Sequence, residues 1–359
     1  MFRNPKIIYS WPYGQHFCKY LRRNASFGEV HPLFESLIAG NRAALARAIT
    51  LSESTLERHK QESAHLMSSV LKHNLQNRSL RIGISGPPGA GKSTFIEAIG
   101  LHITELNNKL AVLAVDPSST RSGGSLLADK TRMQQLSVEK LAYIRPSPNR
   151  GHLGGVARAT NAAIQLCEAG GYNVIIVETV GAGQSEIAVA NMTDIFVLLV
   201  PPGSGDELQG IKKGIVEVAD MILVTKADGN LKTAARLVKT EYSRALRLLR
   251  NHDDTSWKPF VQTVSSISGK GISDAWSDML EFHQEMISTG KYQDRRKKQR
   301  VTWLWDHVQD ELLEHLRKDT LNAKFQEKLE ADVRNGVILP STAAQKLLNL
   351  FLKGKDNIS

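Results

Sequence analysis

Cysteine and long apolar stretches are both scarce in this chain of 359 residues. Its two cysteines, Cys18 and Cys167, lie far apart and in unrelated contexts. A disulfide framework or a cysteine-based metal site is therefore not expected, and a reducing compartment is. No stretch approaches the ~18 consecutive apolar residues of a membrane-spanning helix, so we predict a soluble protein without a membrane partner.

Acidic residues are missing before Glu29, whereas five basic residues precede it: Arg3, Lys6, Lys19, Arg22 and Arg23. Apolar and aromatic residues are interleaved with them, and the continuous apolar centre of a secretory signal is lacking. We therefore expect residues 1–28 to be a mitochondrial presequence and the protein to work in the mitochondrial matrix. A disordered basic tail is the alternative. Removal of this segment halves the formal net charge of +10.

A second basic run stands before an apolar-periodic segment and consists of Lys291, Arg295, Arg296, Lys297, Lys298 and Arg300. Charge runs usually face water, so we interpret this one as a solvated linker rather than as a phosphate-binding arm. No nucleic-acid partner is therefore expected.

The apolar residues divide the rest of the chain into three parts. Residues 29–78 show helical spacing, and residues 79–290 alternate short Val- and Ile-rich runs with helical segments. Such runs are typical of a parallel sheet covered on both faces. We predict the α/β class, a P-loop NTPase with a doubly wound, mainly parallel sheet flanked by helical N- and C-terminal extensions. The predicted strands are Leu80–Ser85, Leu110–Val115, Leu141–Ile144, Val174–Val177, Ile195–Val200, Met221–Val224 and Phe260–Val264.

The third part, residues 291–359, has helical patterns at 295–318 and 320–353. An apolar stripe between Trp303 and Leu316 requires a surface to pack against. That surface is either the chain's own domain or a second copy, which makes this arm a candidate dimerisation element.

A phosphate-binding pattern, Gly, four residues, Gly-Lys-Ser, follows the first predicted strand. Glycines let backbone N–H groups point at phosphate oxygens, Lys92 supplies charge to the β- and γ-phosphates, and the Ser93 hydroxyl can ligate Mg²⁺. The predicted phosphate site consists of Gly86, Pro87, Pro88, Gly89, Ala90, Gly91, Lys92, Ser93 and Thr94.

A second motif, Thr225-Lys226-Ala227-Asp228, matches the Asn/Thr-Lys-x-Asp of GTPases. The Asp228 carboxylate can accept hydrogen bonds from the ring N–H and exocyclic amine of guanine, and adenine offers no such pair. Lys226 would lie along the face of the base. We therefore predict GTP and GDP as ligands. The loop expected to close over guanine is Val264, Ser265 and Ser266, the last in place of the usual alanine.

Acids at strand ends are candidates for Mg²⁺ binding and hydrolysis, because ligands bind at the carboxyl edge of such sheets. Glu178 can reach Mg²⁺ through water, and the Gly181 N–H can contact the γ-phosphate. For Asp116 we favour a Mg²⁺ or water-positioning role over a helix N-cap. Gln184 either orients the attacking water or simply begins a helix. The predicted catalytic residues are Lys92, Asp116, Glu178 and Gln184, and the predicted metal ligands are Ser93, Asp116, Asp129 and Glu178.

Glu178 lies 86 residues after Lys92, farther than in small Ras-like GTPases. An extra strand–helix unit must lie between them, as in the signal-recognition-particle and metallochaperone GTPases. Over about residues 30–350 the sequence resembles the MeaB/ArgK-type GTPases, the chaperones of methylmalonyl-CoA mutase. The resemblance rests on Gly86–Thr94, Asp116–Ser119, Ser122–Ser125, Asp129–Met133, Arg150–Gly155, Glu178–Glu186 and Asp206–Gly214.

This resemblance implies a homodimer formed through the helical extensions. It implies GTP-dependent control of adenosylcobalamin loading onto methylmalonyl-CoA mutase and ejection of damaged cofactor, so that adenosylcobalamin is handled only through the partner enzyme. The adenosyltransferase that delivers adenosylcobalamin is a further expected partner. The segment Gly203–Lys213 resembles an additional switch loop that faces the mutase.

Two other functions remain open. A small-molecule kinase would use the same phosphate loop, but it would need an acceptor pocket and usually an adenine site, which Asp228 disfavours. A GTPase metallochaperone for another metalloenzyme, such as a nickel-insertion protein, would carry His- and Cys-rich metal sites. The histidines here are dispersed: His152, His252, His283, His307 and His315.

Overall fold

The computed structural model describes residues 31–73, 79–115, 133–146, 153–179, 185–203, 213–249, 259–318 and 323–356. These form two compact units, which divide between Val301 and Thr302. The predicted presequence, residues 1–28, lies outside the described residues.

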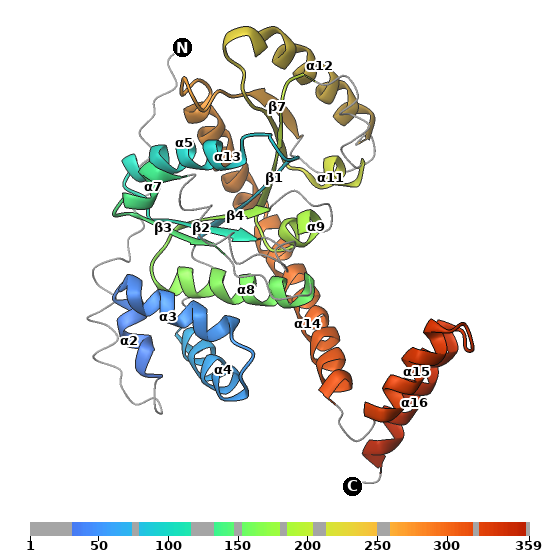
Figure 1. Ribbon diagram of the computed structural model, residues 1–359. Helices are drawn as coiled ribbons and strands as arrows, with labels where there is room; N and C mark the ends of the chain where they lie inside the picture. The colour runs from blue at the N-terminus through green and yellow to red at the C-terminus, as the bar shows by residue number, and fades with distance from the viewer. Residues whose placement is uncertain are drawn as a thin grey trace. The chain divides into compact units, whose positions relative to one another are not determined.

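A seven-stranded parallel sheet forms the centre of the first unit, in the order β3-β2-β4-β1-β5-β6-β7 (Figure 1). Every residue of β1, β2, β4, β5 and β6 is buried, which explains their nearly continuous apolar sequences. The predicted fold class is confirmed, with small changes at the ends of three strands. The strands are β1 (Leu80–Ser85), β2 (Leu110–Val115), β3 (Ala142–Pro146), β4 (Val174–Thr179), β5 (Ile195–Val200), β6 (Met221–Val224) and β7 (Phe260–Thr263).

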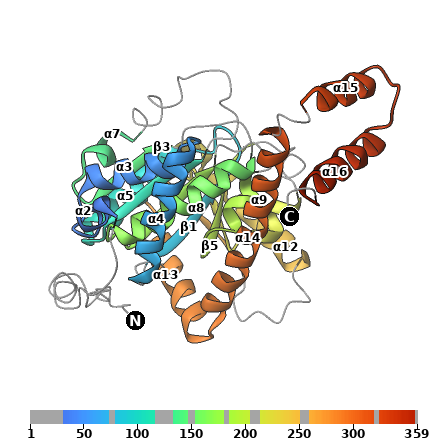
Figure 2. The ribbon, with the colours of Figure 1, turned by 90° about the horizontal axis from the view of Figure 1, so that it is seen from below.

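Helices cover both faces of this sheet (Figures 1 and 2). One face is covered by α5 (Lys92–Glu105), α7 (Gln134–Val138) and α13 (Ile272–Ser288), which share an apolar core with the strands. The other face is covered by α8 (Leu153–Ala169), α9 (Ser185–Ala190), α11 (Lys213–Val218) and α12 (Lys232–Leu249).

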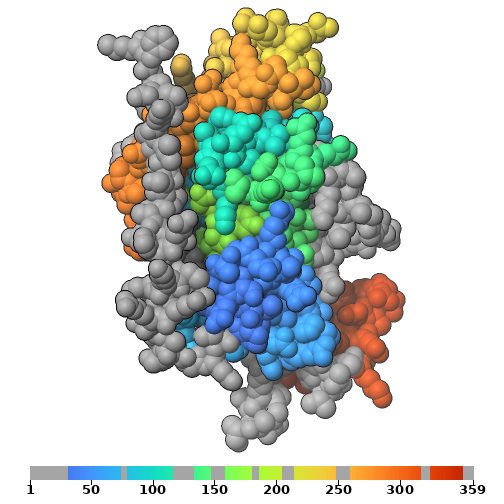
Figure 3. Space-filling view, turned by 90° about the vertical axis from the view of Figure 1, so that its left-hand side faces the viewer, coloured from blue at the N-terminus to red at the C-terminus, as the bar shows by residue number. Residues whose placement is uncertain are grey.

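The N-terminal extension folds as three helices, α2 (Pro32–Ile38), α3 (Arg42–Glu53) and α4 (Glu57–Lys72), as its helical spacing predicts. Asn41 caps α3 by accepting hydrogen bonds from two backbone N–H groups of the first turn. Both α3 and α4 pack on α8, so the extension adds a layer outside that helix. Figure 3 shows this layer in blue beside the teal surface of α5 and the green surface of α7.

The interpretation of the second basic run as a solvated linker is wrong for Arg295 and Arg296. Both lie in α14 (Lys291–Lys318), and Arg296 is only 1% exposed. Its Nε and Nη2 donate to the Asp194 carboxylate at 2.7 and 2.6 Å. Arg295 pairs with Asp220 at 3.0 Å. Because the two aspartates directly precede β5 and β6, these pairs attach the start of α14 to the amino edge of the sheet.

The ion cluster continues into the first strand. Arg81 of β1 donates from Nε and Nη2 to Glu168 of α8 at 3.0 and 2.9 Å, and Arg296 also lies 3.5 Å from Glu168. Burial alone would raise the pKa of Asp194, but the charges of Arg296 and Arg81 outweigh it and hold this pKa below its usual value. The cluster therefore keeps the Asp194 carboxylate charged at neutral pH.

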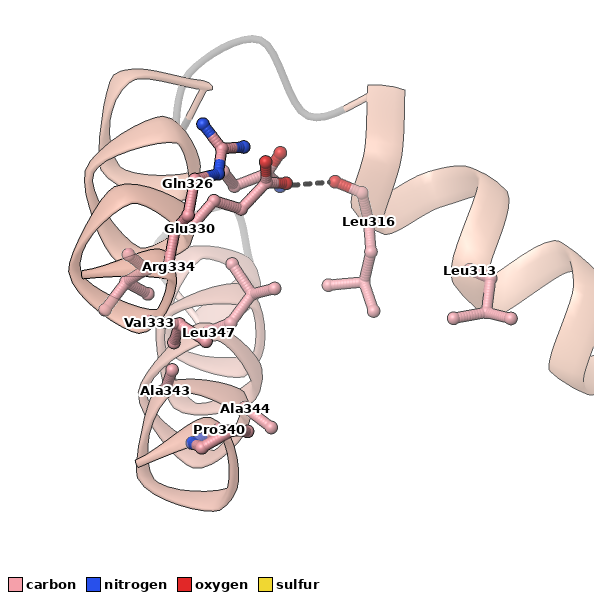
Figure 4. Close-up of a pocket in the computed structure, with 11 residues that line it drawn as sticks. Leu313, Leu316, Gln326, Glu330, Val333, Arg334, Pro340, Ala343, Ala344 and Leu347 are labelled. Atoms are coloured by element: carbon pink, nitrogen blue, oxygen red, sulfur yellow. Dashed lines mark hydrogen bonds between the residues drawn. The ribbon is translucent and has the colours of Figure 1, made fainter. Parts of the chain in front are cut away.

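The second unit contains the end of α14 together with α15 (Ala323–Arg334) and α16 (Pro340–Asp356). The predicted single helix at 320–353 is wrong, because Gly336 adopts a positive φ of 72° after α15 and Pro340 then begins α16. The three helices line an open, mainly apolar pocket of about 570 Å³ (Figure 4). Gln326 donates to the Leu316 carbonyl at 2.6 Å at its edge.

We expect Arg296→Met to destabilise the first unit by about 3–5 kcal/mol, because it leaves the buried Asp194 carboxylate without its charged partner. The loss should be full at neutral pH and should shrink as the pH falls through the lowered pKa of Asp194, since protonation removes the charge that needs a partner. Urea unfolding at several pH values measures this.

Lys297→Met is the matched control for that substitution, because Lys297 is the next residue of α14 and its side chain is 66% exposed. It should change the free energy of unfolding by less than about 0.5 kcal/mol. Equal losses in the two variants would contradict the structural role of the ion cluster.

Candidate functional site

The predicted phosphate loop connects β1 to α5 at the carboxyl edge of the sheet. Gly89 and Gly91 have φ of 80° and 83°, in the left-handed region that favours glycine. Gly86 has φ of 158°, and a Cβ placed on it would lie 2.3 Å from the carbonyl oxygen of Leu199 in β5. The glycines are therefore required by the path of the loop, which starts against β5 and leads into the N-terminus of α5, a favourable position for anions.

The side chain of Lys92 turns back over the loop. Its Nζ donates to the carbonyl oxygens of Gly86 and Pro87 at 2.7 and 3.2 Å. The ammonium charge is thus held directly at the residues that begin the loop.

Side chains at the carboxyl ends of two strands, β6 and β4, contact the loop and hold it in place. The Thr225 hydroxyl, directly after β6, donates to the Ala90 carbonyl at 2.7 Å. The Ser93 hydroxyl donates to Glu178 Oε1 of β4 at 3.3 Å. The contact of Thr225 with Ala90 is buried, and that of Ser93 with Glu178 is partly buried. The loop is fixed in its middle and at its end.

The two predicted guanine-binding segments lie beside each other, because they follow the adjacent strands β6 and β7. Ser265 donates a short hydrogen bond to Asp228 Oδ2, and the Ala227 N–H donates to the Val264 carbonyl at 3.1 Å. Ser265 is buried and Ser266 is half-buried. The serine hydroxyl therefore fixes the orientation of the carboxylate that we expect to read the base.

Lys226 has a positive φ of 52°, which is uncommon for a residue with a side chain. Its side chain is exposed, and its Cε lies 3.9 Å from the position a Cβ would take on Gly91. This backbone turn brings the lysine stem to the phosphate loop, so that the base and phosphate segments form one continuous site.

Glu178 and Ser93 are the predicted metal ligands within the described residues, and the structure brings them together. A carboxylate and a hydroxyl oxygen 3.3 Å apart suit a hard cation such as Mg²⁺. Glu178 lies within β4 instead of after it. Asp116, Asp129, Gly181 and Gln184 lie outside the described residues. Within the described ranges, no group of three or more His, Cys, Asp or Glu side chains is arranged to hold a metal.

Sequence reasoning missed a buried contact at the start of the loop. The Thr179 hydroxyl, at the end of β4, donates to Ser85 Oγ at 2.8 Å. The available signal was a hydroxyl residue at the end of one apolar run, Ser85, and another two residues after the end of a second run, Thr179. Reading it would have required the strand order, which sequence periodicity does not provide.

Comparisons with a family model, with curated proteins and with solved structures all identify GTPases or proteins of this fold. Residues 45–321 match the family described as methylmalonyl-CoA mutase-associated GTPase MeaB. A mouse protein named methylmalonic aciduria type A homolog, mitochondrial, is 49% identical over 330 residues, which cover 90% of this chain and 79% of the mouse chain. A probable GTPase of Mycobacterium tuberculosis is 47% identical over 321 residues, or 89% of this chain and 95% of its own.

A solved structure described as that of a LAO/AO transport system kinase has the same fold. Its TM-score is 0.69 at 36% sequence identity, and the match covers 89% of this chain and 96% of that one. No helix among the described residues is long and apolar enough to cross a membrane.

Gly86→Ala should abolish nucleotide binding, because its Cβ would collide with the backbone of β5. Gly89→Ala is the matched control, since nothing lies within 4 Å of its Cβ position. Its positive φ costs only about 1–2 kcal/mol, so affinity should fall by about tenfold or less. Titration with fluorescent GDP measures binding by both variants, and thermal unfolding shows whether each is folded. Equal loss of binding in Gly86→Ala and Gly89→Ala would refute the packing argument.

Proposed function

This chain belongs to the family of methylmalonyl-CoA mutase-associated GTPases known as MeaB and is a GTPase, and from that premise we propose which residues act on the nucleotide and what its hydrolysis controls. Membership of this family implies a guanine nucleotide with Mg²⁺. The loop Gly86–Thr94 holds the phosphates through its backbone N–H groups and the start of α5.

Lys92 is the phosphate-binding cation in this proposal. Its Nζ donates to two carbonyl oxygens of the loop. It would bind the β- and γ-phosphates by exchanging these carbonyl acceptors for phosphate oxygens. Ser93 and Glu178 hold Mg²⁺, which would neutralise charge developing on the phosphate oxygens. Asp116 and Asp129 are assigned to the same metal, and Gly181 to the γ-phosphate, on the strength of their sequence context.

Hydrolysis breaks the bond between the γ-phosphorus and the bridging oxygen, which leaves with GDP, while water supplies the new oxygen. Positioning and charge stabilisation account for most catalysis of this kind. Gln184 or Asp116 orients the water. The observation that carries the assignment is the pair of hydrogen bonds that join Thr225 and Glu178 to the phosphate loop.

Guanine is selected by Asp228, whose carboxylate accepts hydrogen bonds from the ring N–H and the exocyclic amine. The hydrogen bond from Ser265 supports this role because it leaves the carboxylate one orientation. Lys226 covers one face of the base, and the segment Val264–Ser266 closes over its edge.

The proposed output is control of a partner enzyme. The family description links this fold to methylmalonyl-CoA mutase, and we propose that GTP hydrolysis here gates the loading of adenosylcobalamin onto that mutase and protects or reactivates it. The adenosyltransferase that supplies adenosylcobalamin would then be a second partner. The name of the mouse relative supports a mitochondrial location, in which we place the protein in the matrix with residues 1–28 as its transit segment.

A homodimer is proposed as the working form. Large apolar side chains of α14 remain exposed in the second unit, among them Leu304 at 59% and Trp305 at 61%. Such a face is stabilised by burial against another protein surface. The dimer therefore uses the C-terminal arm.

A kinase is the alternative that a specific observation favours, because the solved relative of the same fold is named a transport system kinase. Purified protein that phosphorylates a metabolite faster than it hydrolyses GTP would replace the chaperone proposal. No such observation favours a metallochaperone.

Asp228→Asn should exchange guanine preference for xanthine, because the amide can donate to the second carbonyl of xanthine but repels the guanine amine. We expect GTP turnover at low substrate to fall about 100-fold or more, and XTP turnover to rise. Kinetics with both nucleotides measure this. An unchanged ratio would remove Asp228 from the base site.

Purified methylmalonyl-CoA mutase should accelerate GTP hydrolysis several-fold in protein that lacks residues 1–28, because partner contacts complete the positioning. Lys92→Ala is the control and should remain inactive with and without the mutase. Basal hydrolysis that the mutase leaves unchanged would retain the GTPase and refute the proposed partnership.

A further inference from the structure

The buried hydroxyl pair of Ser85 and Thr179 lies where the phosphate loop begins. Both side chains have 0% exposure, and the Thr179 Oγ1 to Ser85 Oγ distance is 2.8 Å. Ser85 is the residue before Gly86, and Thr179 is the residue after Glu178. Neither has been assigned to the nucleotide or to Mg²⁺.

The hydrogen bond between Ser85 and Thr179 continues the pairing of β1 with β4 by one residue. The register of β1 and β4 runs from Leu80 opposite Val174 to Ile84 opposite Glu178, so Ser85 and Thr179 are the next positions. On its other side Thr179 is the register partner of Val115, the last residue of β2. Thr179 therefore lies between β1 and β2 at the carboxyl edge of the sheet, where the segments that we assign to the nucleotide site begin.

Two consecutive residues of β4 thus connect that strand to both ends of the phosphate loop. Thr179 donates to Ser85, which precedes the loop, and Glu178 accepts a hydrogen bond from Ser93, the last residue of the Gly-Lys-Ser sequence. If the first contact is lost, the strand end can shift and carry Glu178 with it. A misplacement of about 1 Å can cost about 100-fold in rate.

We propose that Thr179 is a positioning residue for GTP hydrolysis, which fixes Glu178 against the phosphate loop through its hydrogen bond to Ser85. The inference rests on the role proposed above for Glu178. The base and most phosphate contacts come from other segments. Loss of the bond consequently affects the chemical step more than nucleotide binding.

The test replaces Thr179 with valine, which keeps the branched shape and removes the hydroxyl. We expect kcat to fall about tenfold, equivalent to about 1.4 kcal/mol, while the affinity for fluorescent GDP without Mg²⁺ changes less than about twofold. The Mg²⁺ concentration for half-maximal hydrolysis should rise. Thr179→Ser, which retains the donor, should keep kcat within about threefold of the parent.

Ser85→Ala should lower kcat like Thr179→Val, and the double variant should be no slower than either single one, because all three lack the same bond. Thr193→Val is the matched control: Thr193 is also 0% exposed, and its hydroxyl donates to the Val189 carbonyl at 2.9 Å near the opposite edge of the sheet. It should lower the melting temperature without changing kcat.

An unchanged kcat in Thr179→Val, an equal fall in Thr193→Val, or failure of Thr179→Ser to restore the rate would each overturn the inference. Lys92→Ala in the same assay separates this from a failure of the proposed site. If Lys92→Ala still hydrolyses GTP, the site itself is wrongly assigned; if it is inactive while Thr179→Val is normal, only the positioning role falls.

Discussion

The phosphate loop must keep a backbone path that most residues cannot follow, and the buried ends of two strands hold it there. Gly89 and Gly91 have positive φ values, which residues with a Cβ rarely adopt. The hydrogen bonds from Thr225 and Ser93 supply fixed points for this path. The first is buried and the second is partly buried, and a hydrogen bond shielded from water is stronger and its loss more costly. The nucleotide site depends on the sheet edge being rigid before any ligand arrives.

The opposite edge of the same sheet is held by charge. Arg296 and Arg295 of α14 neutralise the aspartates that precede β5 and β6, and Arg81 of β1 joins the cluster through Glu168. Strands β1, β5 and β6 therefore have an ion cluster at their amino ends and parts of the nucleotide site at their carboxyl ends. The helix that leads to the C-terminal arm is attached to the strands that carry the site.

Much of this arrangement could be predicted from the sequence because burial leaves a direct signal. Strands enclosed on both faces are apolar throughout, and motifs such as Thr225–Asp228 occur directly after them. Arg296 could not be placed in this way, because a buried arginine and a solvated one look identical until its partner is known. Asp194 and Glu168 lie more than 100 residues before it. The Ser85–Thr179 contact was missed for the same reason, since it depends on two strands that are neighbours in space and 94 residues apart in the chain. Residues 320–353 form two helices because of Gly336 and Pro340. The helical spacing of apolar residues continues across both positions, so periodicity alone does not show the break.

The ion cluster also affects the order in which the sheet and α14 can fold together. Arg296 donates to the Ser79 carbonyl, a contact that spans 217 residues. During synthesis the chain emerges from its N-terminus, so β1, α8, β5 and β6 are available long before α14. Until Arg295 and Arg296 have been synthesised, Asp194 and Asp220 lack their arginine partners. We therefore expect the amino edge of the sheet to be completed last, when α14 docks against it.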